Sequence, residues 1–276
     1  METYIRSGNY AAKPSLPYTP GSDGAGVIEH SSGGFSKGER VFLAGSITGT
    51  YAKLALCTPE QVFRLPEDIS FEQGAALGVP YGTAHRALFE RGQGRAGETV
   101  LVHDASGGVG TAAVQLAHAA GLRVFGTAST EEGRKLVRES GADEVFDHRA
   151  PGYLEEILAA TGGQGVNLIL EMLANVNLGK DLALLGKGGR VVVIGSRGPV
   201  EINPRDLMAR DADIRGMMLG HAPEAERAHI YTDIAAGLAA GTLQPAIGRI
   251  FPLAQAAEAH QTIMESSAAG KIVLKI

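Results

Sequence analysis

The stretch Thr99-Val-Leu-Val-His-Asp-Ala-Ser-Gly-Gly-Val-Gly-Thr-Ala-Ala-Val-Gln-Leu-Ala-His118 decides the fold of this chain. An apolar strand at 100–102 runs into a glycine-rich turn, which opens a helix with one apolar face. The turn matches the dinucleotide-binding fingerprint at Ala105, Gly107 and Gly110, with alanine in place of the first glycine. Gly107 lets backbone approach a pyrophosphate, Gly110 lets the helix pack on the strand, and the helix N-terminus offers N–H groups to phosphate. An ordinary tight turn is the alternative, but the units that follow favour a nucleotide site.

Apolar runs alternate with amphipathic segments throughout the middle of the chain. The runs are apolar rather than alternating, as expected for parallel strands that are covered on both faces. Six strands with helices between them predict an α/β fold with a doubly wound Rossmann sheet of two halves. The expected strands are 100–103, 123–127, 144–147, 166–171, 190–195 and 213–219, with helices that begin near Gly108, Glu131, Tyr153 and Leu178 and a shorter one near Pro204.

The segments on either side of this sheet have a different pattern. Short strands expected at 26–29, 40–43, 51–56 and 61–65 are separated by Gly, Pro, Ser and Thr, which predicts a small antiparallel domain. A helix expected at 80–91 leads into the sheet. Helices expected at 224–239 and 254–265 and strands at 248–252 and 271–276 follow the sheet. We therefore expect residues 80–219 to form the dinucleotide-binding domain, and residues 1–79 and 220–276 to form a second domain.

Composition excludes several functional classes. The 276 residues carry a formal net charge of −5, which argues against a protein that binds nucleic acid or membranes by electrostatic attraction. The single cysteine, Cys57, excludes an intrachain disulfide and a zinc site with several cysteines, and is interpreted as a small core residue. No run of 18 apolar residues and no signal-peptide pattern is present, so we expect a cytoplasmic protein.

Four motifs together resemble a known family. They are the segments 2–8 (Glu-Thr-Tyr-Ile-Arg-Ser-Gly), 16–23 (Leu-Pro-Tyr-Thr-Pro-Gly-Ser-Asp), 171–178 (Glu-Met-Leu-Ala-Asn-Val-Asn-Leu) and 195–198 (Gly-Ser-Arg-Gly). The chain resembles the zeta-crystallin type of NADPH:quinone oxidoreductase, in the zinc-free branch of the medium-chain dehydrogenase/reductase superfamily. The resemblance implies a Rossmann domain clasped by a GroES-like antiparallel β domain, a cofactor cleft between them, and a homo-oligomer (dimer or tetramer).

The chain departs from the family pattern in three places. His118 stands where the family has Lys, Arg or Ser, and Asp104 replaces a glycine. Two interpretations of the Asp104 carboxylate remain open: it repels a phosphate, or it caps the turn. The family also has about 50 residues ahead of the point that matches Met1, so we expect an N-terminally incomplete GroES-like domain with exposed strand edges, weakened turnover and self-association.

Metal ligands bear directly on the expected chemistry. Zinc relatives have Gly-His-Glu where this chain has Gly21-Ser22-Asp23, and a serine does not replace an imidazole ligand. We therefore expect no metal. Without a Lewis acid the substrate must itself be electrophilic, which fits metal-free reduction of quinones with NADPH. Two alternatives remain: an enone or alkenal double-bond reductase, and a crystallin-like structural or RNA-binding protein. The acidic charge balance argues against RNA as the main partner.

The end of the second strand predicts which nicotinamide cofactor binds. NAD enzymes place Asp or Glu there, but this chain has Gly126-Thr-Ala-Ser-Thr130. Arg134 and Lys135 follow, and either would neutralise a 2′-phosphate. Glu131 and Glu132 argue against this, although acids are also common at helix N-termini for structural reasons. We therefore expect NADPH.

The resemblance implies a set of cofactor-binding residues at the carboxyl ends of the strands, where open α/β sheets bind ligands. The alternative interpretations are a solvated loop residue for His148, a core position for one of the two methionines, a surface residue for Arg197 and a packing role for the aromatic ring of Tyr4. Tyr4 matches the family's tyrosine near the nicotinamide and is the candidate catalytic residue, as a hydrogen-bond or proton donor. The expected cofactor residues are Ser106, Gly107, Gly108, Val109, Gly110, Ser129, Arg134, His148, Asn177, Ile194, Gly195, Ser196, Arg197, Met217, Met218 and Leu219.

Overall fold

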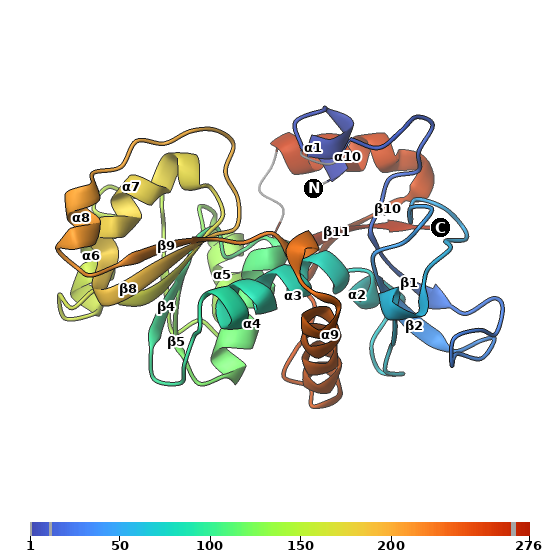
Figure 1. The fold of residues 1–276 in the computed structure, drawn as a ribbon. Helices are drawn as coiled ribbons and strands as arrows, with labels where there is room; N and C mark the ends of the chain where they lie inside the picture. The colour runs from blue at the N-terminus through green and yellow to red at the C-terminus, as the bar shows by residue number, and fades with distance from the viewer. Residues whose placement is uncertain (1, 11–12, 266–268) are drawn as a thin grey trace. The chain divides into compact units, whose positions relative to one another are not determined.

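The computed structural model describes all residues except 1, 11–12 and 266–268, and the described chain divides into two compact units (Figure 1). One unit, here the sheet unit, is 81–230; the other, the flanking unit, is 1–80 with 231–276. The second division point lies inside helix α9 (Glu224–Ala239). An ion pair joins the start of α9 to the sheet unit: Nε of Arg86 lies 2.5 Å from Oε1 of Glu226.

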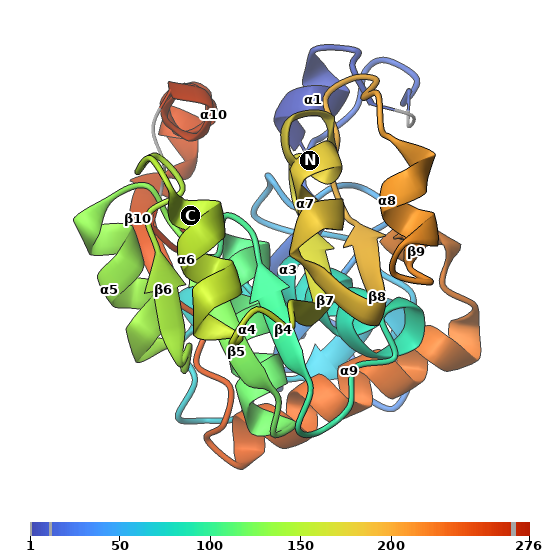
Figure 2. The same cartoon turned by 90° about the vertical axis from the view of Figure 1, so that its left-hand side faces the viewer.

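A six-stranded parallel sheet forms the centre of the sheet unit, in the order β6-β5-β4-β7-β8-β9 (Figure 2). This arrangement confirms the predicted doubly wound α/β fold. Leu101, Phe125 and Ile169 belong to one buried cluster together with residues of α6 and α7. Side chains alternate between the two faces of a strand, so the buried neighbours Val100 and Val102 lie on the opposite face. The strands are β4 (Thr99–Val102), β5 (Arg123–Thr127), β6 (Glu144–Phe146), β7 (Val166–Glu171), β8 (Leu185–Val193) and β9 (Asp213–Gly216).

The helices of the sheet unit connect these strands, and two of the expected bounds need correction. The fourth connecting helix begins at Ala174 rather than near Leu178, because the Ala174 N–H donates to the Gly195 carbonyl and starts the helix there. Strand β8 begins at Leu185 rather than at 190, because Leu185 already pairs with Val166 ahead of an irregularity in the ladder. The helical elements are α3 (Gly78–His85), η2 (Arg86–Arg91), α4 (Gly108–Ala119), α5 (Glu131–Glu139), α6 (Tyr153–Ala160), α7 (Ala174–Leu184), α8 (Pro204–Met208) and η3 (Leu219–His221).

Strand β9 ends at Gly216, three residues earlier than expected. Beyond this point two backbone carbonyls are occupied by arginine side chains. Nε of Arg91 donates to the Gly216 carbonyl (3.1 Å), and Nη1 of Arg86 donates to the Met218 carbonyl (3.0 Å). Residues 217–219 therefore form a loop that leads into η3, although the Met217 N–H still donates to the Val193 carbonyl.

The flanking unit contains an antiparallel sheet of β1 (Asp23–Val27), β2 (Arg40–Ala44) and β3 (Val62–Arg64). Its core centres on three aromatic rings: Phe63 lies 5.3 Å from Phe42 and 4.7 Å from Tyr231, measured between ring centroids. A second, parallel pair joins β10 (Ile247–Pro252) to β11 (Lys271–Lys275). The remaining elements are α1 (Glu2–Arg6), η1 (Pro59–Gln61), α2 (Phe71–Gly74), η4 (Leu253–Gln255) and α10 (Ala256–Glu265).

The strand expected at 51–56 is wrong. This segment has no strand conformation, and the side chains of Leu54 and Leu56 are 71% and 60% exposed. The Leu56 carbonyl accepts one hydrogen bond from the Ile47 N–H, and the Leu56 N–H donates to the side chain of Thr48. These two hydrogen bonds close a loop and do not form the ladder of hydrogen bonds that a strand requires. In the described part of the chain, no helix combines the length and apolar character needed to cross a membrane.

Candidate functional site

The turn between β4 and α4 has the geometry of an anion-binding site. Gly107 is the N-cap of α4, with φ −78° and ψ 171°, and its carbonyl accepts the N–H of Thr111. The N–H groups of Gly108, Val109 and Gly110 belong to the first turn of the helix and so have no acceptor within it. The positive end of the helix dipole lies at the same place. Together these groups provide a site for a phosphate.

The two fingerprint glycines are required for different reasons. A Cβ atom at Gly110 would lie 2.6 Å from Cα and C of Ala105 and from the Asp104 carbonyl oxygen, so packing of the helix on the turn excludes any side chain. A Cβ at Gly107 would meet only the Asp104 carbonyl oxygen, at 3.7 Å, which is an ordinary contact. The negative φ of Gly107 also rules out a left-handed backbone as the reason for glycine. What remains is close approach of a ligand from the open side.

Asp104 adopts a left-handed backbone conformation, with φ 48°, and its side chain is exposed. This conformation gives the physical reason why a glycine suits the position. The Asp104 N–H donates to Oγ1 of Thr127 (3.1 Å), and its carbonyl accepts the N–H of Gly107 (3.3 Å). The backbone of Asp104 therefore closes the turn. Its carboxylate makes no hydrogen bond to the residues that the structure describes.

The segment after β5 contains hydroxyl groups and no carboxylate, as expected. Thr130 caps α5 by accepting the Gly133 N–H at 3.0 Å, and Ser129 lies next to it. Arg134 is held by two carboxylates: Nη1 lies 2.8 Å from Oδ2 of Asp147, and Nη2 lies 2.7 Å from Oε2 of Glu131. Its charge is therefore already balanced by neighbouring residues.

A hydrogen-bonded cluster lies beneath the turn, and sequence analysis missed it. His103, Glu171 and Asp181 are all buried, with Nε2 of His103 2.9 Å from Oδ1 of Asp181 and 3.6 Å from Oε2 of Glu171. Burial raises the pKa of both carboxyl groups and lowers the pKa of His103. The available signal was that His103 and Glu171 both stand at the carboxyl end of a strand. No local pattern links them to Asp181, which is on α7.

Thr127 connects this cluster to the adenosine side of the expected site. Its hydroxyl oxygen lies 3.4 Å from Nδ1 of His103 and 3.4 Å from Nδ1 of His148. His148 is half-buried, and this burial lowers its pKa below the usual range. The alternative of a fully solvated loop residue is therefore wrong for His148, because the ring rests against buried groups at the ends of β4 and β5.

The loops after β7 and β8 are tied together. The Glu171 carboxylate accepts the Leu173 N–H and Nδ2 of Asn177 (3.2 Å). The Arg197 N–H donates to Oδ1 of Asn175 at 2.9 Å, which joins the two loops. The expected residues Asn177, Ile194, Gly195, Ser196 and Arg197 are thus brought together at the same edge of the sheet.

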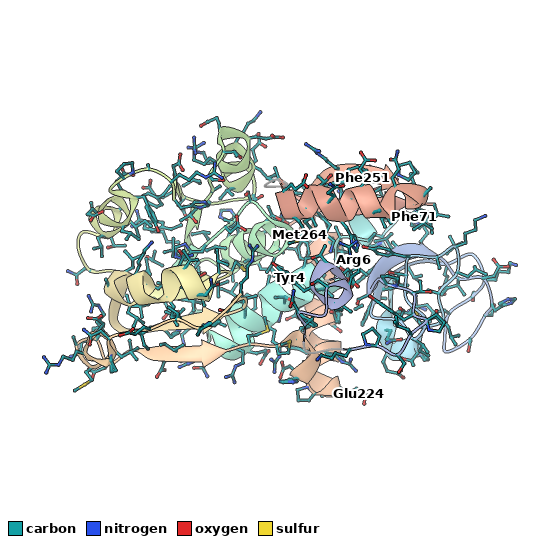
Figure 3. The ribbon with its side chains drawn as sticks, turned by 90° about the horizontal axis from the view of Figure 1, so that it is seen from above. Tyr4, Arg6, Phe71, Glu224, Phe251 and Met264 are labelled. Atoms are coloured by element: carbon teal, nitrogen blue, oxygen red, sulfur yellow. The ribbon has the colours of Figure 1, made fainter. Side chains whose placement is uncertain are left out.

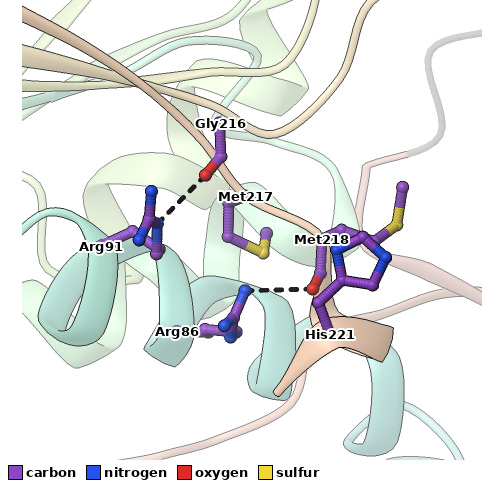
Figure 4. A pocket seen from close by; sticks show the side chains of 6 residues that line it. All are labelled: Arg86, Arg91, Gly216, Met217, Met218 and His221. Atoms are coloured by element: carbon purple, nitrogen blue, oxygen red, sulfur yellow. Dashed lines mark hydrogen bonds between the residues drawn. The ribbon is translucent and has the colours of Figure 1, made fainter.

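A pocket of about 480 Å³ follows the end of β9 (Figure 4). Met217 is half-buried and Met218 is 39% exposed, so neither is a core residue and the core alternative for one of them is wrong. Leu219 begins η3 directly after them. The pocket is lined by Arg86, Arg91, Gly216, Met217, Met218 and His221.

Tyr4 lies on α1 in the flanking unit (Figure 3). The carboxylate of Glu2 on the same helix accepts the Gly21 N–H (3.3 Å) and the hydroxyl of Ser22 (3.3 Å), so α1 is fastened to the segment where zinc relatives have a histidine. Among the described residues, His103, Glu171 and Asp181 form a group with spacing suited to a metal ion.

Comparison with known proteins identifies the family. Residues 108–234 match a family model described as zinc-binding dehydrogenase. Human quinone oxidoreductase is 52% identical over 278 residues, which cover 99% of this chain and 84% of the human protein. Rat quinone oxidoreductase is 51% identical, with the same coverage.

This chain belongs to the quinone oxidoreductase family. The resemblance to the zeta-crystallin type is therefore confirmed. Two solved structures agree with the fold of this quinone oxidoreductase family member. Mycobacterial Rv1454c complexed with NADPH superposes with a TM-score of 0.90 at 30% identity, covering 100% of this chain and 87% of that chain. The quinone oxidoreductase of Escherichia coli complexed with NADPH superposes with a TM-score of 0.87 at 27% identity and the same coverage.

Proposed function

We propose that this chain reduces quinones with NADPH as the hydride donor and without a metal. The observation that carries the proposal is the turn at Gly107, where glycine is required neither by packing nor by φ and the open side faces the first N–H groups of α4. This geometry suits a pyrophosphate held by residues 106–110. The human and rat relatives are quinone oxidoreductases, and two structural neighbours were solved with NADPH, which supports the same activity here.

The adenosine half of NADPH would bind at the end of β5, beside Ser129 and His148. The absence of a carboxylate in 126–130 leaves room for a 2′-phosphate. Arg134 is the first guanidinium after this segment, but its two ion pairs mean that it would have to exchange a carboxylate for the phosphate. We propose that Arg134 divides its N–H donors between the 2′-phosphate and a carboxylate, rather than acting as a free cation.

The nicotinamide half would lie against Asn177, residues 194–197 and residues 217–219. NADPH, when bound, supplies the hydride. The chain orients the ring through these loops, and the half-buried Met217 restricts the access of water. Tyr4 from the flanking unit, which we propose to be a GroES-like domain, would hydrogen-bond the quinone oxygen. We also propose that the chain forms a homo-oligomer and acts in the cytoplasm.

Metal-free chemistry follows from the side chain at position 22. Zinc relatives have a histidine there, whereas Ser22 donates its hydroxyl to Glu2. Quinones accept hydride without a Lewis acid because the product is aromatic. We therefore expect exhaustive chelation to leave quinone reduction unchanged. Loss of activity together with removal of stoichiometric zinc would contradict this part of the proposal.

Gly107→Val tests the cofactor turn. The variant should fold, because its Cβ meets only an ordinary contact, but NADPH should bind at least about tenfold more weakly, which corresponds to roughly 1.4 kcal/mol. Binding is measured by titrating NADPH and following its fluorescence, and folding is checked by thermal denaturation. Gly179→Val is the matched control, since a Cβ at Gly179 also meets one carbonyl oxygen, at 3.6 Å. Unchanged NADPH affinity in Gly107→Val would contradict the phosphate site.

Two further titrations complete the test. NADH that binds tenfold more tightly than NADPH would overturn the cofactor assignment. A panel of quinones and enones with NADPH would separate quinone reduction from the double-bond reductase alternative. Retention of RNA that disappears with rising salt would point to the third alternative.

A further inference from the structure

We propose that Glu171 is a positioning residue, which holds the two loops that carry the nicotinamide-side residues and acts on the cofactor through Asn177. The inference rests on the proposed function. It assigns a role to a buried carboxyl group that does not itself touch the ligand. The role follows from three features of Glu171: the donors that it accepts, the groups behind it, and the cost of burying it.

The first feature is that Glu171 binds both loops with different atoms. Its backbone carbonyl accepts the N–H groups of Ile194 (2.9 Å) and Gly195 (3.2 Å) at the end of β8. Its side-chain Oε1 accepts the Leu173 N–H in the loop after β7 and Nδ2 of Asn177 (3.2 Å) on α7. One residue therefore sets the separation of two loops.

The start of α7 depends on this carboxylate. The N-cap of α7 is Leu173, which has no side-chain oxygen and makes no capping hydrogen bond of its own. A helix N-terminus without a cap leaves N–H groups unsatisfied. The Glu171 side chain supplies the missing acceptor from outside the helix, and the negative charge is favourable at this end of the dipole. Asn177 sits one turn along the same helix, so its side-chain position depends on the same anchor.

The second feature is what lies behind the carboxylate. Oε2 of Glu171 faces Nε2 of His103 at 3.6 Å, and Nε2 of His103 is hydrogen-bonded to Asp181. Through Nδ1, His103 approaches the hydroxyl of Thr127, which also accepts the Asp104 N–H of the phosphate turn. The three loop ends of the expected cofactor site thus meet at one buried cluster, in which His103 is hydrogen-bonded to Asp181 and Thr127 and lies 3.6 Å from Glu171.

The third feature is energetic. Glu171 and Asp181 are fully buried, and within the described part of the chain Oε2 of Glu171 and Oδ2 of Asp181 have no hydrogen-bond donor. A proton held by this pair would reduce the charge to be buried. Two buried carboxyl groups still cost more than apolar side chains of similar volume. Packing alone therefore does not account for them, whereas orientation of Asn177 and the loops does.

The experiment is a double-mutant cycle on the full chain, read out as the Kd of NADPH together with the melting temperature. The variants are Glu171→Ala, Asn177→Ala and the double variant. We expect Glu171→Ala and Asn177→Ala each to raise the Kd of NADPH about tenfold. The Kd of the double variant should exceed that of Glu171→Ala by no more than about twofold, because Glu171 acts through Asn177.

Two further variants separate positioning from general damage to the core. Glu171→Gln keeps an oxygen that accepts both donors, and its NH₂ can donate to the unpaired Oδ2 of Asp181, so it should retain NADPH affinity within about threefold. Asp181→Asn is the matched control: the residue is as buried as Glu171 but makes no hydrogen bond to the loop at 172–177. It should leave the Kd within about twofold while changing the melting temperature.

Several outcomes would overturn the inference. Additive effects of Glu171→Ala and Asn177→Ala would show that Glu171 does not act through Asn177. An equal loss of affinity in Asp181→Asn would show that any change to the buried cluster damages the site. If Glu171→Ala does not fold, Glu171→Met takes its place, because it fills the volume and removes the acceptor. If the parent chain binds no NADPH, the proposed function fails instead, which keeps the two failures distinguishable.

Discussion

The two units of this chain bury their strands to very different extents. In the sheet unit, Val100, Leu101 and Val102 of β4 are fully buried, and β7 is buried at five of its six positions. In the flanking unit, β1 has no buried residue and β10 has none, and the core depends on a few side chains such as Phe42 and Tyr231. A sheet covered on both faces leaves its strand ends as the place where polar groups meet, and the expected cofactor residues cluster there.

Phe42→Ala tests the weaker core and should have the largest effect. Phe42 is fully buried and contacts the rings of Phe63 and Tyr231, so its truncation should destabilise the flanking unit by about 4 kcal/mol. Chemical denaturation should then show an early transition for this unit, while the sheet unit retains NADPH binding. Phe35→Ala is the control, because Phe35 is only partly buried under Arg64. Loss of both units in a single transition would show that the two cores are not independent.

Gly110→Val tests the stronger core at its tightest point. A side chain there meets backbone atoms of Ala105 and Asp104 at 2.6 Å, which should cost about 3 kcal/mol and displace the turn. Both stability and NADPH affinity should fall, whereas Gly107→Val should reduce affinity alone. Denaturation midpoints and NADPH titrations of the two variants make the comparison. Parent-like stability of Gly110→Val would disprove the packing role of this glycine.

The pH dependence of stability should differ between the parent and Asp181→Asn. Burial raises the pKa of Asp181, so the folded state holds a proton more tightly than the unfolded chain does. The stability from this proton is present at low pH and is lost as the pH rises through the raised value, by up to about 1.4 kcal/mol per pH unit for one proton. Melting temperatures between about pH 4 and 7 should therefore fall more steeply with rising pH in the parent than in Asp181→Asn.

Two checks accompany this pH profile. Asp211→Asn should retain the parent's slope, because Asp211 is exposed. The lowered pKa of His103 acts in the opposite direction: its contribution is present above the ordinary histidine pKa and is lost as the pH falls through the lowered value. Identical slopes for the parent and Asp181→Asn between about pH 4 and 7 would exclude Asp181 as the titrating group.

The smallest effect is expected at Asp104. Glycine adopts φ 48° without strain, so Asp104→Gly should stabilise the sheet unit by about 0.5–1 kcal/mol. Asp104→Asn tolerates the same backbone and removes only the charge. If the carboxylate repels phosphate, both variants should bind NADPH more tightly. If it does not, the Kd of both should equal that of the parent. Reduced stability of Asp104→Gly would contradict the conformational explanation.

Sequence patterns predicted most of the sheet unit because its elements are signalled locally. Strands β5 and β7 have the predicted bounds, since each is a continuous apolar run with clear ends. The predicted strands and helix bounds were wrong where a group far along the chain forms a hydrogen bond with the segment. Arg86 and Arg91 end β9 early, the Gly195 carbonyl starts α7 early, and 51–56 closes a loop instead of joining a ladder. These groups lie far along the chain, so no local pattern contains them.

The sequence by itself determined the doubly wound sheet, the glycine-rich turn and the strand ends at which the expected cofactor residues lie, because periodicity and glycine spacing are local properties of the chain. Only the tertiary structure decided that packing requires Gly110 but not Gly107, since both glycines occupy one motif. It also decided that Arg134 is already paired with two carboxylates, and that His103, Glu171 and Asp181 meet. His103 and Asp181 stand 78 positions apart, and they meet because β4 and β7 end at one edge of the sheet and α7 follows β7.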